Sequence, residues 1–358
     1  MEMTFRWYGA NEEKIKLEDI RQIPGCKGIV GTLMDIPVGE VWPKARIKAL
    51  KEEIEAAGLT LKVIESVNIH EDIKMGVPMR DKWIENYKTT IRNLAEYGIE
   101  VICYNFMPVF DWLKTDLDFK LPDGSSTLSF VSSDMPASPE ELIENMEAGA
   151  DGFSLPGWEP ERLSQFKEVF AFYKNVTDDD LRANFKYFME AIIPTCEEVG
   201  IKMACHPDDP PYSVFGLPRM VKNRDDLDWM CNAVDSPSNG ITLCTGSIAE
   251  DPANDVVAIL AEFTKRNRIP FAHVRNIKFT NVAAKDFYEA PHLSSEGSLD
   301  MYAIMQALHD NGFDGYIRPD HGRMIWGETG RPGYGLYDRA LGLSYLNGLW
   351  EALEKQKN

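Results

Sequence analysis

The sequence has no run of basic residues, and acidic residues dominate its charge. Lys and Arg number 38 against 57 Asp and Glu, which gives a formal net charge of −19 at pH 7. A field of that sign repels the phosphate backbone of a nucleic acid unless a local basic patch intervenes. We therefore expect no nucleic-acid partner, and the same charge argues against a metal-dependent endonuclease.

The sequence also lacks the signals of export and of membrane insertion. Its six cysteines form no CxxC pair and no framework spacing. The opening segment MEMTFRWYGANEEK has no apolar signal core, and no apolar run approaches the roughly 20 residues that span a bilayer. We expect a cytoplasmic protein that makes no contact with a membrane.

The composition is ordinary for a globular protein. Hydrophobic residues make up 44% and charged residues 27% of the chain, which excludes disorder, a collagen-like repeat and a coiled coil. Domains average about 150 residues, but a (β/α)8 barrel of about 250 residues or more forms one domain. We expect a single domain over residues 1–358.

Eight short apolar segments recur along the chain, and most are followed by a longer amphipathic stretch. This alternation is typical of βα units around a parallel sheet. The predicted strands cover 4–9, 28–34, 61–66, 100–106, 201–206, 240–246, 271–276 and 315–322, and the predicted helices cover 16–23, 43–57, 79–97, 180–199, 224–235, 254–267, 299–311 and 336–354. Gly58, Gly98, Gly200 and Gly312 each stand between a helix and the next strand, where a helix commonly ends. The pattern predicts an α/β fold, a (β/α)8 TIM barrel.

A long insertion at about 107–179 interrupts this period after the fourth strand. It contains LDFKLPDGSSTLSFV, which predicts a hairpin around Asp123-Gly124, and a helical pattern near 161–174. We expect the insertion to lie over the C-terminal face of the barrel, where the active sites of such barrels are built. There it would act as a lid or a dimer contact; a plain surface decoration is the alternative.

The ends of the last four strands carry side chains that bind metals. His206, Cys244, His273 and Asp320 lie on or at the end of consecutive strands, and strand C-termini converge on one open cavity in a barrel. Two imidazoles, a thiolate and a carboxylate suit a divalent transition metal better than Mg or Ca. Zn is compatible, and Mn or Fe(II) are favoured if a chelating substrate needs open positions.

Further polar residues near these motifs are candidates for binding a substrate. Arg275, Asn276, Arg318 and Arg323 suit a carboxylate or sugar hydroxyls, with a salt bridge to an outer helix as the equal alternative. His292 falls in the loop after the seventh strand, within reach of the rim. Cys205 is out of phase with His206 on its strand, so we expect it in the core.

These segments together resemble the D-mannonate dehydratase family over essentially the whole chain. The matching segments are MTFRWYG, HPDDPP at 206–211, LCTGS at 243–247, HVRN at 273–276, EAPHLSSEGS at 289–298 and RPDHGR at 318–323. The resemblance implies a xylose-isomerase-like barrel, a homodimer and a requirement for Mn2+ or Fe2+. It also implies dehydration of D-mannonate, a small sugar acid, to 2-keto-3-deoxy-D-gluconate in hexuronate (glucuronate) breakdown.

The resemblance assigns roles to six residues of this chain. It implies that the metal is held by His206, Cys244, His273 and Asp320. It implies that His321 and Tyr334 form the acid/base pair, with Tyr337 as a second candidate for the tyrosine. Removal of water from a 2,3-dihydroxy acid needs a base at C2 and an acid at the 3-hydroxyl, beside a Lewis-acidic metal. The sequence leaves open which member of the pair is the base.

The position of His321 directly after Asp320 imposes a condition on the eighth strand. Adjacent residues of a strand face opposite ways, so both can face one cavity only if the strand ends there. Gly322 follows at once, and glycine tolerates the backbone geometry of such a turn.

Two other functions compete with a dehydratase. An aldose–ketose isomerase on the same kind of barrel ranks second, because such enzymes use several carboxylates around paired metals and these strand ends offer one certain carboxylate. A non-catalytic sugar-acid-binding protein is the alternative from a different class. The presence of both acid/base residues beside the metal ligands argues against it.

Overall fold

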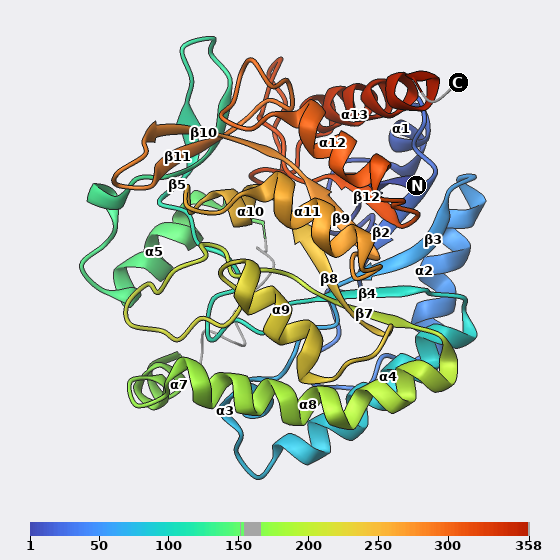
Figure 1. The fold of residues 1–358 in the computed structure, drawn as a ribbon, viewed down its shortest axis with the longest axis vertical. Helices are drawn as coiled ribbons and strands as arrows, with labels where there is room; N and C mark the ends of the chain where they lie inside the picture. Colours follow the sequence, from blue (N-terminus) through green and yellow to red (C-terminus); the bar gives the residue numbers. More distant parts are fainter. Residues whose placement is uncertain (151, 154–165, 357–358) are drawn as a thin grey trace.

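Eight parallel strands close into a barrel at the centre of the molecule (Figure 1). The structure is a computed structural model that describes residues 1–150, 152–153 and 166–356. In chain order the barrel strands are β1 (Glu2–Arg6), β2 (Gly28–Gly31), β3 (Thr60–Glu65), β4 (Val101–Tyr104), β7 (Lys202–Cys205), β8 (Asn239–Cys244), β9 (Phe271–Val274) and β12 (Tyr316–Pro319). Each overlaps one of the eight predicted strands, so the predicted fold class is confirmed.

Helices surround the barrel and follow the strands, as the periodicity predicts. The surrounding helices are α1 (Leu17–Arg21), α2 (Lys44–Ala56), α3 (Glu71–Met75), α4 (Arg80–Glu96), α8 (Asp178–Val199), α9 (Arg224–Ala233), α10 (Thr245–Ala249), α11 (Val256–Lys265), α12 (Met301–Asp310) and α13 (Leu336–Gln356). The four glycines predicted to end helices, Gly58, Gly98, Gly200 and Gly312, have φ values of 77°, 72°, 78° and 82°. Only glycine takes this left-handed conformation without a steric penalty.

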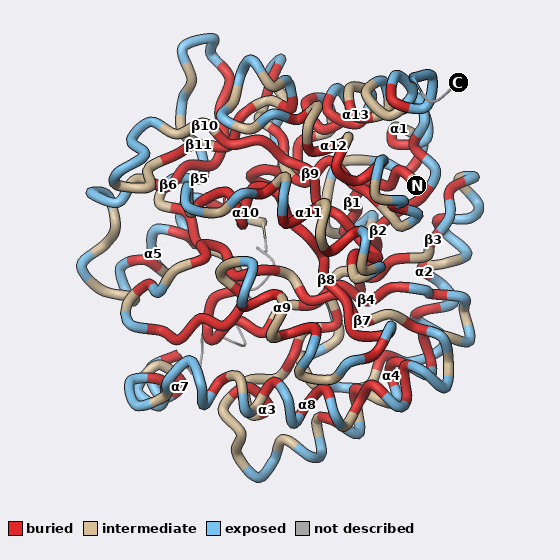
Figure 2. Tube along the Cα trace, in the orientation of Figure 1, coloured by how far each residue is buried: buried red, intermediate tan, exposed pale blue. Residues whose placement is uncertain are grey.

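The barrel has an inner and an outer apolar layer. Val30, Val63, Val101, Cys103, Ala204 and Phe271 pack together inside the barrel. Ile64, Ile102 and Cys205, which alternate with them along the strands, pack in the outer layer between the strands and the helices. Figure 2 shows the buried strands at the centre and the exposed loops around them. The expected position of Cys205 in the core is confirmed.

A second, antiparallel sheet of four strands lies beside the barrel (Figure 1). Its order is β10 (Asn276–Asn281), β11 (Asp286–Ala290), β6 (Ser126–Phe130) and β5 (Asp116–Lys120). We call it the auxiliary sheet. The predicted hairpin around Asp123-Gly124 is present as β5 and β6.

The hairpin of β10 and β11 was missed by the sequence analysis. The predicted seventh strand over 271–276 was too long, because β9 ends at Val274 and Asn276 already begins β10. Besides β10, β11 also pairs with β6, where Phe287 lies opposite Phe130. A pairing between segments so far apart in sequence leaves no local periodicity that could reveal it.

The insertion after β4 also carries two helices in the described part of the chain. They are α5 (Pro139–Gly149) and α7 (Phe166–Tyr173), with a short 3-10 turn at Ser132–Asp134. The first part of the helix predicted near 161–174 lies outside the described residues. No helix in the described chain combines the length and the apolar character that crossing a membrane requires.

Candidate active site

A cavity opens at the carboxyl ends of the barrel strands. Its lining comprises Arg6, Glu65, Ser66, Cys103, Tyr104, Asn105, Met107, Asp111, Trp112, His206, Asp209, His273, Arg318, Asp320, His321 and Tyr334. Most of these residues lie at the carboxyl end of a barrel strand or directly after it. Asp111 and Trp112 come instead from the insertion after β4. The cavity therefore has walls from both the barrel and the insertion.

Three of the predicted metal ligands meet at one edge of this cavity. His206, Cys244 and His273 each offer a ligand atom, and these atoms lie within 4.8 Å of one another. Asp320 joins them, with Oδ2 3.4 Å from Cys244 Sγ and Oδ1 3.5 Å from His273 Nδ1. The structure therefore brings together all four residues that the strand ends predict.

The hydrogen bonds of the two histidines prepare them for a metal ion. His206 Nδ1 lies 2.7 Å from the Pro207 carbonyl oxygen, which only accepts, so Nδ1 carries the proton and Nε2 keeps its lone pair. His273 Nε2 lies 3.1 Å from Glu65, so there the lone pair is on Nδ1, which has Arg318 Nη2 at 3.5 Å. Metal-binding histidines commonly donate their second nitrogen to an oxygen in this way.

The remaining two candidate ligands also fit a cation. Ser247 donates to Cys244 Sγ from its hydroxyl at 3.0 Å and from its backbone N–H at 3.5 Å, and these two bonds fix the position of the sulfur. Burial raises the pKa of Asp320, but Arg318 and His321 offset this and hold it well below its usual range. Asp320 is thus ionised at neutral pH, as a metal ligand would have to be. A set of two nitrogens, one sulfur and one carboxylate fits a divalent transition metal.

His321 and Tyr334 face each other beside the metal ligands. His321 Nε2 lies 3.0 Å from Tyr334 Oη. Burial, and then the neighbouring Tyr8, raise the pKa of Tyr334 well above its usual value, so its phenol stays protonated at neutral pH. Tyr337, the second candidate, is exposed on α13 and its ring packs against Trp326. Tyr334 is the tyrosine of this loop that lines the cavity.

The chain leaves the barrel directly after β12. The strand ends at Pro319, so Asp320 and His321 both lie beyond it and can face one cavity. Gly322 pairs with Tyr334 in an isolated bridge, which brings the tyrosine back to the site. Gly322 is not among the glycines with positive φ, contrary to its expected role. It is needed for close packing, because a Cβ there would lie 2.9 Å from the backbone nitrogen of Arg339.

A buried network of charges lies behind the ligands. Lys114 Nζ lies 2.6 Å from Asp209 and 3.1 Å from Glu250. Arg275 contacts the same two carboxylates at 2.8 and 3.1 Å and also pairs with Glu289. Burial and the charge of Asp209 raise the pKa of Glu250 well above its usual value, whereas the pKa of Asp209 is lowered because its two cations outweigh burial. The network fixes the wall of the cavity.

Of the five predicted substrate-binding residues, Arg318 alone lines the cavity. It pairs with Glu65 at 2.9 Å and with Asp320 at 2.7 Å, and its position on the same face as Asp320 follows the strand alternation. Arg275 lies behind the ligands, in the buried network. Both guanidinium groups are fully buried and are already paired with carboxylates of the protein itself.

The other three predicted substrate-binding residues lie outside the cavity lining. Asn276 is hydrogen-bonded to the backbone of the loop that follows β11. His292 Nε2 lies 3.0 Å from the carbonyl oxygen of Val274, and its ring packs under α13. Arg323 is paired with Asp338 through two nitrogens at 2.9 and 3.2 Å. Each side chain is engaged in packing a loop against the barrel.

Sequence reasoning missed several residues of the site. Glu65 ends β3 and orients His273, and the signal for it was an acid at the end of a predicted barrel strand. Asp209 lies within the HPDDPP segment and lines the cavity. Glu289, whose carboxylate oxygens lie 2.8 and 3.0 Å from His321 Nδ1, gave no signal because its strand was not predicted.

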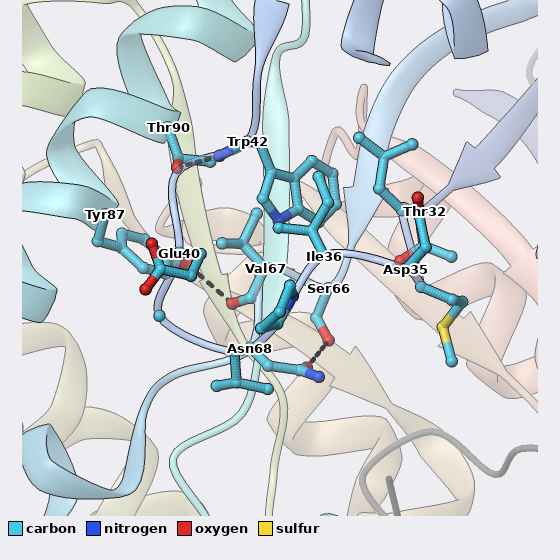
Figure 3. Close-up of a pocket in the computed structure, with 15 residues that line it drawn as sticks. Thr32, Asp35, Ile36, Glu40, Trp42, Ser66, Val67, Asn68, Tyr87 and Thr90 are labelled. Atoms are coloured by element: carbon cyan, nitrogen blue, oxygen red, sulfur yellow. Dashed lines mark hydrogen bonds between the residues drawn. The ribbon is translucent and has the colours of Figure 1, made fainter. Parts of the chain in front are cut away.

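A second cavity lies beside the first, between the loop after β2, the end of β3 and α4 (Figure 3). Its volume is about 260 Å³, against about 70 Å³ for the barrel cavity, and Ser66 lines both. Its polar side chains are partly engaged, since Tyr87 donates to the Val67 carbonyl and Thr90 accepts from the Trp42 N–H. Its described lining contains neither His nor Cys, so we place the chemistry in the smaller cavity.

Comparison with known proteins agrees with this geometry. The D-mannonate dehydratase (UxuA) family matches residues 1–358. Mannonate dehydratase of Lactococcus lactis subsp. cremoris (strain MG1363) is 75% identical over 357 residues, covering 100% of both chains, and that of Thermotoga maritima (strain ATCC 43589 / DSM 3109 / JCM 10099 / NBRC 100826 / MSB8) is 57% identical over 358 residues, covering 100% of this chain and 99% of its own.

Solved structures lead to the same family. The crystal structure of mannonate dehydratase from Streptococcus suis serotype 2 superposes with a TM-score of 0.90 at 48% identity, covering 100% of this chain and 96% of that one. A xylose isomerase domain protein from Planctomyces limnophilus, at 12% identity and a TM-score of 0.55, covers 99% of this chain and 98% of its own and shares the fold alone. The chain belongs to the D-mannonate dehydratase family.

Proposed function

We propose that this chain removes water from D-mannonate to give 2-keto-3-deoxy-D-gluconate, in the breakdown of hexuronates such as glucuronate. The observation that carries the proposal is that His321 and Tyr334, 3.0 Å apart, share one cavity with His206, His273 and Asp320, three of the four candidate metal ligands, and that the fourth, Cys244, adjoins them. Removal of water from a 2,3-dihydroxy acid needs a base at C2 and an acid at the 3-hydroxyl, and a Lewis acid at the carboxylate assists the first of these steps. The names of the relatives supply the substrate.

We propose that His206, Cys244, His273 and Asp320 hold one Mn2+ or Fe2+ ion. The support is the donor set together with the two histidine lone pairs that Pro207 and Glu65 leave free. When bound, the ion would polarise the carboxylate and 2-hydroxyl of the substrate and make the C2 proton more acidic. Zn2+ fits the same ligands and is the alternative.

We assign the base to His321 and the acid to Tyr334. Glu289 accepts from His321 Nδ1–H, so Nε2 carries the lone pair that can take the C2 proton. Tyr334 holds its proton because burial raises its pKa, and a protonated phenol can donate to the departing 3-hydroxyl. The C2 proton thus passes to His321, the phenol proton leaves with water, and the enol product becomes the 2-keto acid.

Two guanidinium groups suit the negative charge of a sugar acid at the cavity wall. Arg318 lines the cavity while it is also ion-paired with Glu65 and Asp320. Arg6 also lines it and donates to the carbonyl oxygen of Val30 at 3.1 Å, while its Nε is buried without a hydrogen-bond acceptor in the described chain. We propose that Arg6 and Arg318 bind the carboxylate or hydroxyls of the substrate.

The insertion at 107–179 is proposed to close the site. Asp111 and Trp112 from this segment line the cavity, which supports a lid rather than a decoration. We also propose that the chain forms a homodimer. Trp326, Tyr337 and Leu341 are large apolar side chains left 75%, 43% and 50% exposed, and a second copy would cover them. Light scattering on the purified protein gives the oligomeric state directly.

A reducing cytoplasm is the proposed compartment. All six cysteines are free and buried in the structure, which is the usual state of thiols in such a compartment. Measurement of activity in a cytoplasmic extract against other fractions of the same cells tests this.

The decisive test of function is turnover. The protein is incubated with D-mannonate and with Mn2+, Fe2+ or Zn2+, and a 2-keto-3-deoxy acid is detected by mass spectrometry. Formation of a ketose from an aldose, with no product from D-mannonate, would replace the dehydratase by an isomerase. Binding of D-mannonate without any product would leave a sugar-acid-binding protein.

A further inference from the structure

We propose that Glu289 of β11 is the positioning residue of His321. Its carboxylate fixes the proton on Nδ1 and the plane of the ring, and it thereby aims the lone pair of Nε2 at the substrate. The inference rests on the proposed function, in which His321 is the base. It also makes the auxiliary sheet, which stands outside the barrel, a part of the catalytic apparatus.

The contact between Glu289 and His321 is short and shielded from water. The two carboxylate oxygens lie 2.8 and 3.0 Å from His321 Nδ1, and Glu289 is 4% exposed. The pKa of Glu289 is lowered, because the charges of Arg275 and His321 outweigh burial. An ionised carboxylate only accepts hydrogen bonds, so Nδ1 is the donor and carries the proton.

Arg275 offers a competing arrangement that the charges exclude. Its Nη1 lies 2.9 Å from the same Nδ1 of His321, where a guanidinium nitrogen can only donate. If Nδ1 accepted that bond, its lone pair would face two negative oxygens of Glu289 within 3.0 Å. When His321 Nδ1 and Arg275 both donate to the Glu289 carboxylate, each of the three groups has a suitable hydrogen-bond partner.

Glu289 is held from several sides, as a positioning residue requires. Arg275 pairs with its carboxylate, and its backbone carbonyl accepts from the Thr127 hydroxyl of β6 at 2.8 Å. On its other side it pairs with Ile277 of β10 in the antiparallel ladder. Strands from two separate βα loops therefore fix one carboxylate, and a group fixed by a sheet is held more precisely than one on a loop.

The substitution Glu289→Gln tests this role with Glu250→Gln as its matched control. Both residues are buried and contact Arg275, but burial and the charge of Asp209 raise the pKa of Glu250, and no contact joins Glu250 to His321 in the described chain. We expect Glu289→Gln to lower kcat by about 10²-fold relative to Glu250→Gln, as loss of an orienting carboxylate does in histidine-based catalysis. We expect KM to change by less than about threefold and the metal content per chain to stay at the parental value, because Glu289 contacts neither the predicted ligands nor the cavity.

Two further measurements cover the case in which Glu289→Gln fails to fold. Glu289→Asp keeps the charge beside Arg275 but withdraws the carboxylate from His321, and we expect a similar loss of kcat. In the parental protein loaded with Zn2+, nitrogen-15 NMR of labelled histidines reports which ring nitrogen carries the proton. The histidine signal that is present in the parental spectrum and missing from the spectrum of His321→Asn belongs to His321. We expect this signal to show that Nδ1 carries the proton.

Each result decides the proposal. A kcat for Glu289→Gln or Glu289→Asp within about threefold of the Glu250→Gln value, metal loss that accounts for the whole decline, or an Nε2–H form of His321 would each overturn the role of Glu289. The parental protein is assayed first with D-mannonate. If it gives no product, the proposed function fails, while the NMR result still judges the positioning of His321.

Discussion

Glu65 stands between a predicted metal ligand and a buried arginine, so Glu65→Gln is an informative perturbation. The carboxylate accepts from His273 Nε2 at 3.1 Å and from Arg318 at 2.9 and 3.2 Å. Its pKa lies well below the usual range, because Arg318 and His273 outweigh burial. Glutamine has the same size but only one accepting oxygen, and its amide nitrogen would meet a donor of His273 or of Arg318.

The magnitude of the effect follows from what each contact does. Replacing the carboxylate behind a metal-bound histidine costs about 10- to 100-fold in metal affinity, which is about 1.4 to 2.8 kcal/mol. Arg318 keeps Asp320 at 2.7 Å, so it is not left unpaired by the substitution. We therefore expect a folded protein that binds its metal more weakly and is active only at raised metal concentration.

Titration calorimetry with Mn2+ on the metal-free protein measures this effect. Asp338→Asn is the matched control, since Asp338 is another buried carboxylate on an arginine, Arg323, but lies away from the cavity. We expect the control to bind Mn2+ with the parental affinity. If Glu65→Gln bound Mn2+ within about twofold of the parental affinity, Glu65 would not orient a metal ligand, and the assignment of His273 to the metal would lose its support.

Three further predictions concern the ligands and the acid/base pair. Cys244→Ser should retain far less metal on elemental analysis, because a hydroxyl is a poorer ligand than a thiolate; parental metal content would remove Cys244 from the site. His321→Asn should keep its metal and lose turnover by about 10²–10⁴-fold, whereas Asp320→Asn should lose metal as well. Tyr334→Phe should lose turnover on the same scale but still exchange the C2 proton of D-mannonate in D2O. If only His321→Asn kept this exchange, Tyr334 would be the base and His321 the acid.

The sequence predicted the barrel because its signals are local. Each strand and helix has its own periodicity, and Gly58, Gly98, Gly200 and Gly312 mark four of the junctions with positive φ. The strand ends then locate the metal ligands, since alternation along β7 alone separates Cys205 in the outer layer from His206 in the cavity. These predictions needed no knowledge of which segments meet.

The rest of the site depends on contacts between distant segments, which the sequence could not supply. Arg323 and Asn276 belong to motifs at the strand ends, yet their side chains are engaged by Asp338 and by a loop backbone outside the cavity. Glu289 reaches His321 only because β11 pairs with β6 from another loop. The partner of a polar side chain near a motif is set by the tertiary fold. The hydrophobic periodicity of the sequence gives no information about that partner.

The charges of the site explain why these residues form one unit. Four carboxylates have lowered pKa values, four cations lie among them, and Glu250 is neutralised by its raised pKa; the carboxylates are Glu65, Asp209, Glu289 and Asp320, and the cations are Arg6, Lys114, Arg275 and Arg318. The four positive charges therefore balance the four carboxylates. Buried charges must be balanced, and these ion pairs let the carboxylates stay ionised inside the protein. The carboxylates that contact the two histidines, Glu65 at His273 and Glu289 at His321, are thus themselves held by Arg318 and Arg275.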